Sequence, residues 1–148
     1  MRLAGHLCSS RCQEVIEGDF DFIRTLPDMG FGRIQVNATG QNAVIVAKDT
    51  NSLQRYADNL MRGMVEVPAL EWILQYNTET KPLVDIILAA HSAGTHQGQN
   101  FSILFDASMG TGKLATSVTA PLPGVKCGYA GGLGPSNIEE QILNIAAV

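Results

Sequence analysis

Short apolar runs rich in β-branched residues alternate along this chain with stretches of helical spacing, and this alternation constrains the fold more than any other feature. The alternation predicts strands over residues 2–7, 33–38, 70–76, 101–106 and 125–130. It predicts helices over residues 13–26, 51–64 and 78–90, and a last helix that opens at residues 135–137. One strand and one helix together take roughly 25–35 residues, which is typical of βαβ units and a parallel sheet.

The composition of the strands favours the same fold class. They are near-continuous apolar runs, as expected where helices cover the faces of a parallel sheet. The chain has 148 residues, of which 45% are apolar and 16% charged, and this is enough for one globular core. We therefore predict a single α/β domain over residues 1–148, with five to six parallel β/α units.

Charge and cysteine content exclude several classes of function. The net charge is −4 and no cluster of Lys and Arg is present, which argues against a nucleic-acid partner. No apolar run approaches the roughly 20 residues of a membrane span, and the first residues do not form a signal peptide. The three cysteines, Cys8, Cys12 and Cys127, are an odd number that fits reduced thiols. We expect a cytoplasmic protein without a membrane partner.

Polar residues stand at the carboxyl ends of the predicted strands, and the fifth strand runs into two glycines. Residues two apart on a strand share a face, and α/β folds bind ligands at the carboxyl ends of their strands. Any one of these polar pairs also fits an ordinary strand-to-loop junction, so it is the recurrence that favours a site. The pattern predicts a ligand site that contains His6, Cys8, Gln35, Asn37, Gln75, Asn77 and Asp106.

The histidines and cysteines do not predict a metal site. His6, Cys8 and Cys12 lie close in sequence, but a Cys-x3-Cys unit without a second cysteine pair is a weak zinc signal. His91 and His96 precede the fourth strand, so they belong to the opposite end of the sheet from His6. We expect neither a metal nor a cofactor.

Two glycine-rich motifs follow the fourth and fifth strands. The first is Ile-Leu-Phe-Asp at residues 103–106 followed by Gly-Thr-Gly-Lys at residues 110–113. The second is Ala-Gly-Gly-Leu-Gly-Pro-Ser-Asn at residues 130–137. In order and spacing they resemble phosphoribosylanthranilate isomerase, where a strand ending in Asp precedes Gly-Gly-Thr-Gly-Lys and the next strand precedes Ala-Gly-Gly-Leu-x-Pro-x-Asn. The resemblance covers roughly the last third of the chain.

The resemblance implies a (β/α)₈ barrel and an isomerase of the tryptophan-biosynthesis type. Its reaction, an Amadori rearrangement of a small phosphorylated aminoaldose, needs only proton transfer and no cofactor. Asp106 matches the family's general acid, and a carboxyl shielded from water at a strand end suits that role. The alternatives are structural: a loop cap for Asp106 and a tight turn for the glycines. The glycines that the resemblance places in the site are Gly131, Gly132 and Gly134 for the phosphate, and Gly110 and Gly112 for the substrate.

The sequence also departs from the family. The family's general base is a cysteine at the end of the first strand, in a Lys-x-Cys-Gly context that nothing here matches. By strand count Cys8 ends the third strand of a barrel, so the first two strands and the eighth are not among the predicted ones. We expect an incomplete barrel, or alternatively an open flavodoxin-like sheet, with a homodimer or complementing chain over its edges. A non-catalytic relative or fragment that binds a metabolite or a protein partner is the alternative function.

Overall fold

The computed structural model describes residues 3–44, 46, 49–96, 98, 100–106, 108 and 111–148. Five parallel strands form one sheet in the order β1-β2-β3-β4-β5, with each strand paired to the next in sequence. The sheet is open, because β1 and β5 are its two edges. The strands are β1 (Leu3–Leu7), β2 (Phe31–Val36), β3 (Glu71–Tyr76), β4 (Phe101–Asp106) and β5 (Cys127–Ala130).

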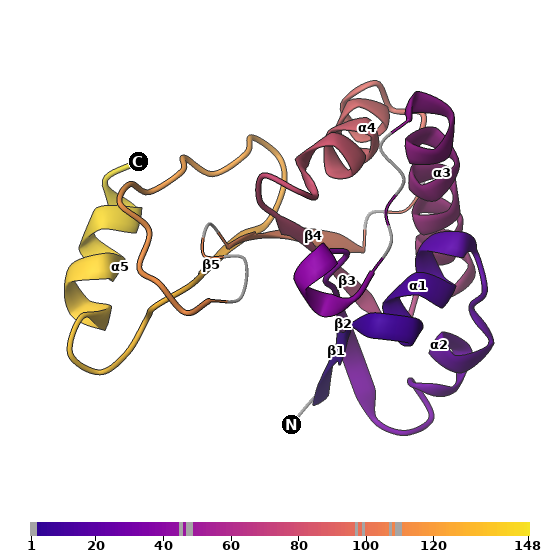
Figure 1. Ribbon diagram of the computed structural model, residues 1–148, viewed down its shortest axis with the longest axis horizontal. Helices are drawn as coiled ribbons and strands as arrows, with labels where there is room; N and C mark the ends of the chain where they lie inside the picture. The colour runs from indigo at the N-terminus through magenta and orange to yellow at the C-terminus, as the bar shows by residue number, and fades with distance from the viewer. Residues whose placement is uncertain are drawn as a thin grey trace.

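This strand order places the connecting helices together. Right-handed crossovers that always step to the next strand in the same direction leave their helices on one face of the sheet. Figure 1 shows α1 to α4 gathered on one side of the strands. The prediction of parallel β/α units in an incomplete barrel is confirmed, whereas the flavodoxin-type order 2-1-3-4-5 is not the order found. The helices are α1 (Ser9–Glu17), α2 (Asp21–Thr25), α3 (Thr50–Glu66), α4 (Lys81–Ser92) and α5 (Ile138–Ala146), and a 3-10 turn covers Gly40–Asn42.

The core lies between the sheet and these helices. Trp72 of β3 is 0% exposed and meets the Phe20 ring edge-on, with the ring centroids 6.1 Å apart. Helix α3 packs between α1 and α4. Its side chains Leu60 and Met64 are buried, as the helical spacing of residues 51–64 predicts. Asp49 caps this helix by accepting a hydrogen bond from the Ser52 amide at 2.9 Å.

The first predicted helix, over residues 13–26, is wrong as one element. The chain forms two helices there, because Gly18 adopts a left-handed conformation with φ 92° at the end of α1. Its amide and that of Asp19 donate to the carbonyls of Val15 and Glu14 and close the helix. The Asp19 side chain then accepts from the Asp21 amide at 3.0 Å and starts α2.

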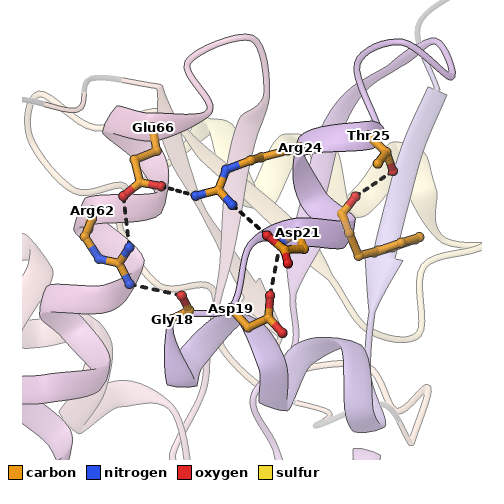
Figure 2. A network of polar contacts seen from close by, with 8 residues as sticks. Gly18, Asp19, Asp21, Arg24, Thr25, Arg62 and Glu66 are labelled. Carbon is orange, nitrogen blue, oxygen red and sulfur yellow. Dashed lines mark hydrogen bonds and ion pairs between the residues drawn. The ribbon is translucent and has the colours of Figure 1, made fainter.

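One network of charged residues joins the ends of α1 and α3 to α2, at the amino end of the sheet; Figure 2 shows its contacts. Arg62 donates to the Gly18 carbonyl at 3.0 Å and to Glu66 at 2.9 Å. Arg24 joins Glu66 to Asp21, at 2.5 and 2.8 Å. In β/α barrels, contacts at the amino ends of the strands serve stability. Ligands bind at the carboxyl ends.

Helix α5 stands apart from the other helices (Figure 1). In the part of the chain that the structure describes, the connection from β4 to β5 contains no helix, so no helix stands between α4 and α5 in sequence. Ile138, Ile142 and Ile145 are expected inward from their spacing, but Ile142 is 56% exposed. Gln141 is buried in its place, so the inward assignment of Ile142 is wrong.

None of the helices in the described ranges is long and apolar enough to span a membrane. The three cysteines are all free thiols, as expected.

Candidate site at the carboxyl ends of the strands

The strand register places four of the predicted residues on the face of the sheet that points away from the core. His6 is paired with Gln35 in register, and Gln35 with Ile73. Gln75 lies two residues beyond Ile73 on β3 and pairs with Leu104, two residues before Asp106 on β4. Because side chains two apart share a face, His6, Gln35, Gln75 and Asp106 form one row that climbs across four strands.

Hydrogen bonds connect three members of this row. Gln35 Nε2 donates to Gln75 Oε1 at 2.8 Å, and Gln75 Nε2 donates to Asp106 Oδ2 at 3.0 Å. Gln75 is 1% exposed and Asp106 is 7% exposed, whereas Gln35 is half-buried. The row therefore connects a buried carboxyl group to a side chain that solvent reaches.

The other oxygen of Asp106 is held by Ser108. Asp106 Oδ1 accepts from the Ser108 amide at 3.1 Å and from Ser108 Oγ at 2.6 Å. These two contacts close an Asx turn at the end of β4, as an Asp that ends a strand commonly does. The loop-cap role of Asp106 is thus present in the structure, together with its contact to Gln75.

The two glycines after β5 lie close to this carboxyl group. Asp106 pairs in register with Ala130, the residue before Gly131. A Cβ atom on Gly131 would come within 3.1 Å of Ser108 Oγ, and one on Gly132 within 2.4 Å of the Leu114 amide nitrogen. Their φ values are 106° and 65°, so both positions require glycine for conformation as well as for space. The side of Gly132 on which a Cβ would stand is therefore occupied by the chain's own β4–β5 connection.

Asn37 and Asn77 organise the loops at this end of the sheet. Asn37 accepts from Thr39 Oγ1 at 3.1 Å. Asn77 Oδ1 accepts from the amides of Glu79 and Thr80, at 2.9 and 3.1 Å, and so turns the chain into α4. Asn77 is 7% exposed, and its Nδ2 has no hydrogen-bond partner within the described residues. A buried donor without a partner is uncommon in folded proteins, and this one is shielded from the surface.

The remaining predicted residues are dispersed. His6 is exposed on the edge strand β1, and Cys8 is exposed beyond the end of that strand, at the N-cap of α1. Gly112 is exposed with φ 69°, and Gly110 lies outside the described residues. Gly134 donates its amide to Asn137 Oδ1 at 2.8 Å in the turn that opens α5.

Two residues that contact this site have no assigned role in the sequence-based predictions. Ser108 touches both Asp106 and Gly131. Asn137 bridges the Gly132 carbonyl, at 2.9 Å, and the Gly134 amide. The Asp-x-Ser spacing after a strand and the Asn before a helix are the signals that predict such turns and caps.

A cavity of about 450 Å³ opens at the same end of the sheet, on the side of the helices. It lies between the loops that follow β2 and β3, which the Gly40 amide joins by donating to Glu79 Oε2 at 2.8 Å. A second cavity, of about 340 Å³, lies at the amino end of the sheet. The first is lined by Ala38, Gly40, Val44, Val46, Leu53, Thr78, Glu79 and Pro82, and the second by Glu71, His91, Asn100, Phe101, Gly124, Val125 and Lys126.

The open face of the sheet is the one that points away from the core. At its amino end, charged side chains neutralise one another. Glu71 pairs with Arg33 and Lys126 at 2.8 Å each, and accepts from Ser102 Oγ at 3.0 Å. Burial acts to raise the pKa of Glu71, but the hydrogen bonds from Lys126 and Ser102 and the charges of Lys126 and Arg33 outweigh it and lower that pKa. The strand-end row differs, because there Asp106 contacts neutral donors and no cation among the described residues.

The arrangement can hold a carboxyl group in a fixed orientation and present amides to the polar groups of a ligand. The described residues contain no group of three His, Cys, Asp or Glu side chains that could bind a metal ion. No family model matches this chain, and no curated protein and no solved structure matches it either.

Proposed function

We propose that this chain is an isomerase-like protein, related to phosphoribosylanthranilate isomerase, that acts on a small phosphorylated, sugar-derived substrate at the carboxyl ends of its strands. Asp106 is the proton-transferring group. The observation that carries the proposal is the location of this carboxyl group: it is nearly buried, it ends a central strand, and Ser108 links it to the Gly131 turn. Both motifs of the resemblance thus meet at one place.

In the proposed reaction, a proton on Asp106 passes to the ring oxygen of the aminoaldose. The bond between that oxygen and C1 breaks, and the nitrogen lone pair forms a C=N bond. A carboxyl group that is positioned by hydrogen bonds and shielded from water suits such a step. The family's cysteine base has no counterpart in this sequence, so the acid is the one catalytic residue we assign.

We place the phosphate group at the turn of Gly131 and Gly132; the Gly134 amide would join them only by releasing Asn137 Oδ1, to which it donates here. Backbone amides of a glycine turn and the N-terminus of α5 favour an anion. His6, Gln35 and Gln75 line the side of the site that faces away from the core.

Calorimetric titration with an aminoketose-phosphate analogue tests this function. We expect saturable binding to the unaltered chain and a loss of at least about tenfold in affinity, or about 1.4 kcal/mol, for Asp106→Asn. Asp58→Asn is the matched control, because Asp58 is an exposed carboxylate on α3 whose one hydrogen bond within the described ranges comes from Gln54. Equal binding by the two variants would exclude Asp106 from the site.

The open edges of the sheet favour a second candidate function, a non-catalytic barrel relative that a partner completes. β1 and β5 each pair on one side alone, which leaves a row of backbone donors and acceptors on the other side. A homodimer or a complementing chain would cover these edges. Sedimentation of the purified chain tests this candidate: a dimer is expected, and a monomer that unfolds cooperatively would contradict it.

A further inference from the structure

The hydrogen bonds of Gln35, Gln75 and Asp106 form one chain with a fixed direction. A carboxylate only accepts hydrogen bonds, whereas an amide group has one donor side and one acceptor side. Gln75 therefore turns its Nε2 to Asp106, and its Oε1 is left to accept from Gln35 Nε2. Gln35 has then used its donor side, and it presents Oε1 at the end of the chain.

Ser108 determines which carboxyl oxygen of Asp106 takes up a proton. The Ser108 amide always donates to Oδ1 and Ser108 Oγ lies 2.6 Å from the same oxygen, so Oδ1 is the better-satisfied acceptor of the two carboxyl oxygens. A proton on Asp106 therefore goes to Oδ2, the oxygen that faces Gln75. In the ligand-free protein such a proton makes Oδ2 a donor, and two donors would then face each other.

Rotation of the two amide groups removes this conflict. The terminal torsion of a glutamine is roughly two-fold, so a half-turn exchanges Oε1 and Nε2 without moving the backbone. Gln75 then accepts from Asp106 and donates to Gln35, and Gln35 must turn as well to accept. Gln35 now presents Nε2 where it presented Oε1 before.

We propose that Gln75 and Gln35 are positioning residues that form a two-state amide relay, which transmits the protonation state of Asp106 to the open face of the sheet. Asp106 and Gln75 are buried, whereas Gln35 is half-buried and pairs in register with the exposed His6. The relay thus gives a buried carboxyl group an effect at a surface that a ligand can reach. Chains of hydrogen bonds polarise one another in this way, which strengthens the coupling.

The relay also suits the proposed function, on which this use of it rests. With a protonated Asp106, Gln35 offers a donor to the oxygen atoms of an incoming sugar. For the transfer, the Oδ2 proton must turn from Gln75 to the ring oxygen. Once it has left, Gln75 and Gln35 return to their first orientation, and Gln35 offers an acceptor to a hydroxyl group of the open-chain product. The site is therefore expected to select ligands with a hydroxyl group that reaches Gln35, beyond Gln75 from the acid.

Side-chain amide signals in ¹H–¹⁵N NMR spectra of the ligand-free chain test the relay. Asp106→Asn places an NH₂ group where Oδ2 stood, and this imposes the reversed direction. We expect the signals of both Gln75 and Gln35 to shift in this variant. Ser108→Ala is the control, because it removes a neighbour of Asp106 but keeps the carboxylate, so the Gln35 signals should stay in place.

A variant that interrupts the relay makes the test specific. In a Gln75→Leu background, Asp106→Asn should no longer move the Gln35 signals. If Asp106→Asn does not fold, acidification of the unaltered chain and of Gln75→Leu provides the same comparison. Two results would overturn the relay. In the first, Asp106→Asn shifts the Gln75 signals but not the Gln35 signals. In the second, the Gln35 signals still shift in the Gln75→Leu background. Neither binding nor turnover enters this test, so the relay and the proposed function can fail separately.

Discussion

Gly63 in α3 shows how little space single residues have on the covered face of the sheet. A Cβ atom there would lie 2.6 Å from Trp72 Cη2 and 2.9 Å from Phe20 Cε1. Both rings are buried, with 0% and 1% exposure, so neither can move aside freely.

We expect Gly63→Ala to destabilise the protein by about 1–3 kcal/mol through overpacking. The roughly 1 kcal/mol that alanine gains over glycine in a helix offsets part of this loss, so the net change is a loss of up to about 2 kcal/mol. Urea unfolding measures the difference, with the exposed Asn51→Ala on the same helix as a control that should change stability by less than about 0.5 kcal/mol. A gain in stability for Gly63→Ala would show that the rings are not held as described.

His96 makes the stability of the α4–β4 connection dependent on pH. Burial lowers the pKa of His96 below its ordinary value of 6.5, and the nearby His91 lowers it further. The unfolded chain therefore binds a proton at a higher pH than the folded one. The free energy of unfolding should rise with pH from the lowered pKa of His96 up to its ordinary value, and be lost as pH falls through that window.

Unfolding in urea across this pH window, with and without His96, measures the effect. His96→Asn should flatten the dependence of stability on pH, whereas His6→Gln should preserve it because His6 is exposed. An unchanged slope in His96→Asn would contradict the assignment.

At the scale of single residues, the sequence could predict positions better than contacts. The alternation rule predicts that Gln35, Gln75 and Asp106 stand at strand ends, and the register confirms it. It does not predict that Gln75 reaches Asp106, because that contact depends on the relative heights of neighbouring strands. Ser108 was missed since a serine two residues after a strand is common in loops of every kind.

Helices form where the sequence predicts them when both the hydrophobic spacing and the capping residues indicate the same bounds. Helix α3 has both the spacing and the Asp49 cap. The pair α1 and α2 was predicted as one helix, because the buried spacing of Val15, Ile16 and Ile23 continues across the break. The left-handed Gly18 ends α1 there. A single glycine within a helical pattern does not by itself predict the end of a helix.

The orientation of α5 could not be predicted because it depends on what covers it. Ile142 and Leu143 are 56% and 71% exposed, and within the described ranges the β4–β5 connection has no helix that could pack against them. A spacing rule assumes that the apolar side of a helix finds a core, and here that neighbour is missing.

Paired truncations in α3 and α5 test the difference between these elements. Leu60 is 1% exposed, so Leu60→Ala should cost about 2–5 kcal/mol of unfolding free energy. Ile142→Ala should change it by less than about 0.5 kcal/mol, because the exposed side chain loses few contacts. Similar losses in the two variants, measured by urea unfolding, would mean that α5 is packed into the same core.

At the scale of the whole molecule, the fold class followed from the alternation of strands and helices, and the parallel sheet in sequential order confirms it. Whether the sheet closes could not be read from the strands, because closure depends on the partner of each edge. The end of the sheet at which we propose the ligand site also follows from its direction, since all five strands point their carboxyl ends the same way. The arrangement of charges agrees, with the Arg24, Arg62 and Glu66 network at the other end (Figure 2).

NMR shift mapping can show whether ligands bind at the carboxyl ends of the strands. Backbone ¹H–¹⁵N shifts are mapped while an aminoketose-phosphate analogue is added to the full chain. The largest changes are predicted at Gln75, Asp106, Ser108 and Gly131. Changes confined to the amino-end cavity around Glu71 and Asn100, or none at saturating analogue, would contradict the account.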